Sequence, residues 1–163
     1  MKKYAILLSH NNFLYLGLEH YLRQSNILLF HESDINKFLN LCSAAEDDEV
    51  IVFYDDQFSK ITPVIFHDKC FSLINTTHLK QDRLNDCLLL DEEKPLKSYP
   101  SHFKSTVMEK KAIYYYAFYK MTYREIAKKM QITETRVSYI INNYVKGMNF
   151  KNKNYFIIHL NPM

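Results

Sequence analysis

The first half of the chain alternates short apolar runs with segments whose apolar side chains recur at helical spacing. Residues 3–9, 26–30 and 50–54 are apolar runs of strand length, and the last one, Val-Ile-Val-Phe-Tyr, is apolar on both faces. The segments between them predict two helices, the first starting at Asn11 or Asn12 and the second at Ser33 or Asp34. Strands that alternate with helices and are apolar on both faces indicate a doubly wound parallel sheet.

Further elements are predicted before this pattern ends. One of the apolar segments 61–67 and 70–75 should form a fourth strand. We expect a short helix over residues 79–85 and a fifth strand over 87–90. Residues 91–102 then combine two prolines with mixed charges, which is typical of a linker. We therefore predict an α/β domain over residues 1–91, a linker over 92–103 and a second domain over 104–163.

The second half of the chain is predicted to be helical throughout. Thr122 and Glu125 form a T-x-x-E capping box, Thr133 can cap the next helix, and Gly147 stands where that helix should end. Gln131 and Ile132 leave room only for a tight turn between these two helices. The expected helices span residues 107–119, 122–130, 133–147 and 152–160. The two in the middle form a helix-turn-helix, in which a small residue such as Ala127 lets the helices cross closely.

The charge is distributed unevenly along the chain. The formal net charge is +3, but residues 101–163 carry 11 basic and three acidic side chains, so they account for +8. The preceding residues carry −5. A positive field confined to a helix-turn-helix is the pattern of a module that binds nucleic-acid phosphates. The alternative is a solvated helical surface with surplus lysines.

The second half also resembles the four-helix DNA-binding domain of LuxR, FixJ and GerE regulators. The resemblance covers about a third of the chain and is most specific over Glu125-Ile126-Ala127, Ile132-Thr133 and Arg136-Val137. Upstream, Thr106, Glu109, Ala112 and Ile113 follow the same pattern. Lys120 stands where the family has a glycine, Arg136 and Ile140 replace its threonine and histidine, and Gly147 replaces a lysine.

The resemblance implies an all-α four-helix domain that binds double-stranded promoter DNA, with helix 133–147 in the major groove. The positions that would contact bases are Ser138, Tyr139 and Asn142. The positions that would contact phosphates are Arg136, Lys146, Lys128, Lys129 and Thr133. The last helix would mediate dimerisation through Phe156, Ile157 and Leu160. Each of these residues has a plainer alternative role as a solvated or packed helix position.

The first half resembles a response-regulator receiver that has lost part of its chemistry. Asp55 or Asp56 follows the strand at which a receiver carries its phospho-accepting aspartate. The acidic pair that holds Mg²⁺ in receivers is replaced here by Ser9 and His10, which are poor ligands for that ion. We therefore expect a degenerate pseudo-receiver that is not phosphorylated. Such a domain would act through a homodimer or a heterodimer with a response regulator.

The remaining sequence features point away from enzymes and membranes. There is no nucleotide-binding glycine loop, no metal-ligand spacing among the seven histidines and no apolar stretch long enough to span a bilayer. Three cysteines without paired spacing fit a bacterial cytoplasmic protein, and no cofactor or metal is expected. The alternative function is a protein-interaction, redox-sensing or ligand-sensing module that modulates another regulator without binding specific DNA. Its candidate elements are Cys42, Cys70, Cys87 and the tyrosines at 114–116 and 119.

Overall fold

The predicted parallel sheet is confirmed in a computed structural model that describes residues 3–44, 49–67, 71–78 and 103–160. Within them, four parallel strands lie in the order β2-β1-β3-β4, the order of doubly wound receiver-like sheets. The strands are β1 (Lys3–Leu8), β2 (Leu28–His31), β3 (Glu49–Tyr54) and β4 (Phe71–Asn75). Of the two candidates for the fourth strand, the later one is correct, because residues 62–65 form a short helix, α3 (Thr62–Ile65).

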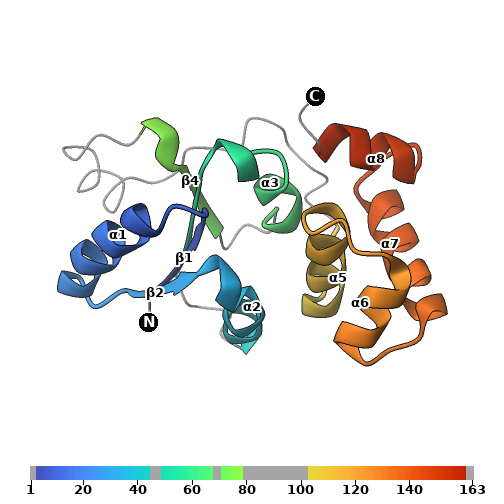
Figure 1. Ribbon diagram of the computed structural model, residues 1–163, viewed down its shortest axis with the longest axis horizontal. Coiled ribbons are helices and arrows are strands. Elements are labelled where there is room, and N and C mark those ends of the chain that lie inside the picture. Colours follow the sequence, from blue (N-terminus) through green and yellow to red (C-terminus); the bar gives the residue numbers. More distant parts are fainter. Residues whose placement is uncertain (1–2, 45–48, 68–70, 79–102, 161–163) are drawn as a thin grey trace.

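Both faces of the sheet are covered by helices (Figure 1). Helix α1 (Asn12–Gln24) buries Leu18 and Leu22 against one face, where Ala5 and Phe53 point. Helix α2 (Ile35–Ala44) and α3 cover the opposite face, where β1 and β3 present the alternate side chains. The strands are therefore apolar on both sides because each side meets a helix.

The second helix of this half starts differently from the prediction, and several predicted elements lie outside the described residues. The helix over residues 35–44 does not start from a cap by Ser33 or Asp34. The chain enters it through a 3-10 turn, η1 (Glu32–Asp34), capped by the His31 ring, whose Nδ1 accepts from the Ser33 amide at 3.3 Å. The predicted helix 79–85, strand 87–90 and linker residues 92–102 lie outside the described residues, as do Cys70 and Cys87.

The second half forms four helices, as predicted: α5 (Val107–Ala117), α6 (Tyr123–Met130), α7 (Glu134–Gly147) and α8 (Lys153–Leu160). Helices α5 and α6 each begin with a complete capping box, at Thr106 and Thr122. Lys120 and Gln131 adopt left-handed backbone conformations, with φ of 53° and 56°. Glycine is the usual residue in this conformation.

The sheet and the C-terminal helices share one continuous hydrophobic core. Helix α5 packs against α2 and α3, on the side of the sheet opposite α1 (Figure 1). Phe58 stacks on Phe118 with ring centroids 4.3 Å apart, and the Tyr144 hydroxyl donates to the Val64 carbonyl oxygen at 2.7 Å. The two halves are therefore docked to each other by specific buried contacts. Within the part of the chain that is described, no helix is long and apolar enough to span a membrane.

Candidate nucleic-acid interface

Helices α6 and α7 form the predicted helix-turn-helix. The Thr122 hydroxyl accepts from the Glu125 amide at 3.3 Å, while the Glu125 carboxylate accepts from the Thr122 amide at 2.8 Å. The carboxylate also accepts from the Thr122 hydroxyl at 2.8 Å, and the bonds from the Thr122 amide and hydroxyl lower the pKa of Glu125 below its usual value. At the other end of α6, left-handed Gln131 reverses the chain, and the Ile132 amide donates to the Ala127 carbonyl oxygen at 3.0 Å. Backbone hydrogen bonds to the last turn of α6 thus fix the turn between the two helices.

Helix α7 is anchored by its inner face. Thr133 caps it as predicted, since its hydroxyl accepts from the Arg136 amide at 3.2 Å. All five side chains predicted to face the core are buried, namely Val137, Ile140, Ile141, Tyr144 and Val145. With Tyr144 also bonded to Val64, this side of α7 is unavailable to a ligand.

The outer face of α7 is a polar stripe. Thr135, Tyr139, Asn142 and Lys146 follow one another at helical spacing, opposite the buried face. Tyr139 is 56% exposed, and the Arg136 guanidinium lies 5.4 Å from its ring centroid. The Asn142 amide contacts the Ser138 hydroxyl at 3.5 Å. The predicted base-contact residues therefore lie together, with Ser138 at the edge of the stripe. Thr135 belongs to the same stripe and was missed, although its spacing from Tyr139 was a usable signal.

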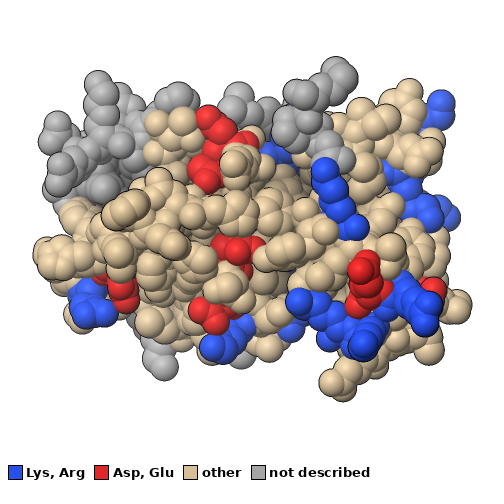
Figure 2. All heavy atoms as spheres, viewed as in Figure 1, with Lys and Arg blue, Asp and Glu red and all other residues tan. Residues whose placement is uncertain are grey.

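Basic side chains surround this stripe. Figure 2 shows lysine and arginine gathered over the C-terminal helices, with few acidic side chains among them. Arg136, Lys146, Lys128 and Thr133 are all exposed, as phosphate contacts must be. Lys129 is also exposed but differs in direction, because its Nζ lies 4.9 Å from the Tyr115 ring centroid and the side chain lines a cavity beside α5.

The predicted dimerisation residues lie on the inner side of α8. Phe156 and Leu160 are 0% and 7% exposed because they pack into the chain's own core, and Ile157 is packed against the same core. Phe156 and Leu160 therefore offer a second chain little surface in this fold, and dimerisation through them stays a prediction. The exposed apolar side chains of α8 are Tyr155 and Ile158, at 57% and 67%.

Gly147 is the last residue of α7, as predicted, and it also has a packing role. Its backbone is not left-handed, and left-handed Asn149 follows the helix. A Cβ atom at Gly147 would overlap the Phe103 ring. The glycine therefore allows the segment before α5 to lie directly against α7.

The carboxyl edge of the sheet carries the receiver-like aspartates. Asp55 caps the 3-10 turn η2 (Asp56–Phe58) by accepting from the Gln57 amide at 3.0 Å, and Asp56 accepts from the Asn75 side-chain amide at 3.1 Å. Across this edge, the buried Ser9 hydroxyl accepts from the Asn11 amide at 3.1 Å. Among the described residues, no group of three or more histidine, cysteine or acidic side chains is arranged to hold a metal ion.

Comparisons with known proteins support the fold. No protein-family model and no curated protein matches the chain. Among solved structures, it is similar to the complex of the two-component response regulator RcsB with DNA, at 13% identity and a TM-score of 0.55 over 99% of this chain and all of that one. It is also similar to RcsB from Salmonella enterica serovar Typhimurium bound to promoter rprA with BeF3−, at 12% identity and a TM-score of 0.53 over the whole of both chains.

A third structure contains two RcsB dimers bound to two parallel DNAs and gives 12% identity and a TM-score of 0.51 over 98% of both chains. At these identities the likeness concerns the fold. The chain therefore shares the fold of these response regulators, with a receiver-like parallel sheet followed by a four-helix unit that contains a helix-turn-helix.

Proposed function

We propose that the protein is a transcription regulator that binds double-stranded promoter DNA by placing α7 in the major groove. The observation that carries this proposal is the division of α7 into two faces. The inner face is fixed by packing and by the Tyr144 hydroxyl, whereas the outer face is polar and exposed and begins at a capped end. A recognition helix needs both properties. The RcsB structures of the same fold include complexes with DNA, which supports the assignment.

The residues of the outer face divide into two roles. Tyr139, Asn142 and Ser138, with Thr135 added from the structure, lie where side chains can reach base edges. An asparagine amide can pair with adenine through two hydrogen bonds. The positions proposed for phosphates are Arg136, Lys146, Lys128 and the capped helix start at Thr133.

We further propose that the sheet domain regulates by association rather than by phosphorylation. Asp55 and Asp56 already accept bonds from Gln57 and Asn75, and Ser9 stands where a receiver needs a carboxylate for Mg²⁺. The partner would be a second copy or a response regulator, reached in part through Tyr155 and Ile158 on α8.

In vitro selection of duplexes from a random library, using the full chain, tests DNA binding. On the selected sequence, Asn142→Ala should weaken binding by about 1–3 kcal/mol, or roughly 5–150-fold, because one base contact is lost. Asn12→Ala, an exposed helical position on α1, is the matched control and should bind normally. If no sequence is enriched, the chain is an interaction module instead, and if Asn142→Ala binds the selected sequence normally, the base contact assigned to Asn142 is wrong.

Two measurements test the mode of regulation. Intact-mass analysis after incubation with acetyl phosphate and Mg²⁺ should show no phosphoryl adduct, and an adduct on Asp55 or Asp56 would contradict the proposal. Sedimentation on the selected duplex should show two chains per site, and Ile158→Glu should shift this to one. A single chain per site in the unmodified protein, also with a response regulator added, would rule out association through α8.

A further inference from the structure

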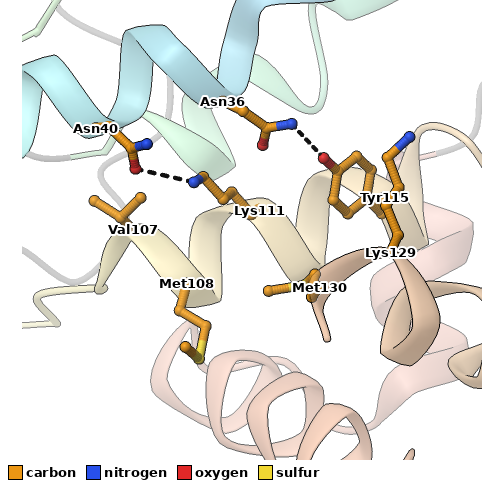
Figure 3. Close-up of a pocket in the computed structure, with 8 residues that line it drawn as sticks. All are labelled: Asn36, Asn40, Val107, Met108, Lys111, Tyr115, Lys129 and Met130. Carbon is orange, nitrogen blue, oxygen red and sulfur yellow. Dashed lines mark hydrogen bonds between the residues drawn. The ribbon is translucent and has the colours of Figure 1, made fainter. Parts of the chain in front are cut away.

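Two hydrogen bonds between side chains join helix α2 of the sheet domain to helix α5 of the helical half (Figure 3). The Asn36 side-chain amide donates to the Tyr115 hydroxyl at 2.5 Å, and the Lys111 ammonium donates to the Asn40 side-chain oxygen at 2.9 Å. The partners are 79 and 71 positions apart in the sequence. These bonds add polar contacts to the hydrophobic core that the two halves share.

Buried contacts complete this junction at the C-terminal end of α5. Phe118 stacks on Phe58 of the sheet domain, and the hydroxyls of Tyr114 and Tyr119 both donate to the Glu32 carboxylate. Separation of the two halves would expose these rings to water and break both bonds to Glu32. Domains within a chain move relative to each other unless their interface is large and hydrophobic, as it is here. The docked arrangement is therefore the stable one.

The docked sheet domain leaves the outer face of α7 accessible. It contacts α7 on the inner face, where the Tyr144 hydroxyl donates to the Val64 carbonyl oxygen at 2.7 Å. The polar stripe lies opposite this face, and Thr135, Tyr139 and Lys146 in it are all exposed in the docked chain. In Figure 1, α6 and α7 lie on the far side of α5 from the sheet. Docking thus holds α7 from behind and does not cover the side chains proposed to read DNA.

We infer, on the basis of the DNA binding proposed above, that the docked form is the form that binds DNA. The sheet domain then supports α7 and does not inhibit it. In a regulator whose sheet domain covers the reading helix, only the undocked fraction of chains binds, so the apparent affinity is reduced by that fraction. Here the docked chains are competent, and no undocking step precedes binding. Control of DNA binding acts through the association of chains and not through the release of α7.

A reversible link across the junction tests this inference on the full chain. Asn40→Cys/Lys111→Cys, with the native cysteines replaced by serine, puts one thiol on α2 and one on α5, where the side chains of Asn40 and Lys111 meet. A short bis-maleimide that contains a disulfide joins the thiols, and a reductant then releases the link in the same sample. The linked and released proteins should bind the selected duplex with affinities that agree within about twofold, because docked chains are competent.

The matched control is Asn36→Cys/Asn40→Cys, which carries the same reagent on α2 without joining the two halves. The inference is overturned if the linked protein binds at least about tenfold more weakly than both its released form and this control. It is also overturned if Tyr119→Phe, which loses one bond between the halves, binds at least about tenfold more tightly than the unmodified chain. If the unmodified chain binds no duplex, the proposed function fails as well, whereas a loss caused by the link alone leaves that function standing.

Discussion

Tyr114→Phe removes one hydroxyl from the buried contact that joins α5 to the sheet domain. Tyr114 is fully buried and donates to the Glu32 carboxylate at 2.5 Å, and Glu32 itself is only 5% exposed. Tyr119 donates to the same carboxylate oxygen. The carboxylate is therefore held by two tyrosines from the helical half, and the substitution removes one of these bonds without creating a large cavity.

The expected loss follows from the charge and burial of the acceptor. A hydrogen bond to a charged group contributes about 1.5–3 kcal/mol. Because Tyr119 still donates to Glu32, the loss in Tyr114→Phe should fall near the lower end, about 1.5–2 kcal/mol. For a chain of this length that is a decrease of roughly 3–8 °C in Tm. The double variant Tyr114→Phe/Tyr119→Phe removes both donors and should lose more than the sum of the single variants, about 3–5 kcal/mol.

Urea and thermal unfolding, followed by circular dichroism, measure these losses. Tyr155→Phe is the matched control, because that side chain is 57% exposed and its hydroxyl should contribute less than about 0.5 kcal/mol. A Tyr114→Phe variant as stable as Tyr155→Phe would refute the assignment of Glu32 as a buried anchor between the two halves.

Three further predictions concern single positions. Burial and the bond to Glu32 raise the pKa of Tyr119 to about 12. Stability should therefore fall as pH rises from about 10, where the tyrosine of the unfolded chain ionises, to about 12. The fall should be shallower in Tyr119→Phe, and an alkaline unfolding curve that this variant leaves unchanged would contradict the prediction. Gly147→Ala should be about 1–3 kcal/mol less stable in urea than Gly17→Ala, because a Cβ at Gly147 overlaps Phe103 whereas one at Gly17 meets nothing; equal stability would remove this role for Gly147. Lys120→Gly should raise the free energy of unfolding by about 1 kcal/mol, since the φ of 53° is unfavourable for any side chain, and a loss of stability would contradict the strain argument.

Local patterns in the sequence were enough to predict most of the described helices and strands. Apolar runs located β1 and β3, and the caps at Asn11, Thr122 and Thr133 were readable because each depends on residues within one helical turn. The polar stripe of α7 was predictable for the same reason. Helical spacing alone decides which residues of the stripe lie next to one another.

Contacts between distant segments were not readable in this way. Tyr114 and Tyr144 look like ordinary apolar helix positions, yet their hydroxyls bond to residues 82 and 80 positions away. Helix α8 is apolar nearly all round, so its pattern does not separate the chain's own core from a face for a second chain. The sequence therefore could not show that Phe156 is buried and Ile158 exposed.

The salt dependence of binding to the selected duplex, measured by fluorescence anisotropy, tests most directly whether α7 is the DNA-reading helix. The logarithm of the binding constant should fall linearly with the logarithm of salt concentration, and the slope should shrink by about 0.9 for each phosphate contact removed by Arg136→Gln or Lys146→Gln. Lys37→Gln, an exposed position on α2, should leave the slope unchanged. Binding that is independent of salt, or a slope that Lys37→Gln reduces as much as Lys146→Gln, would contradict the account.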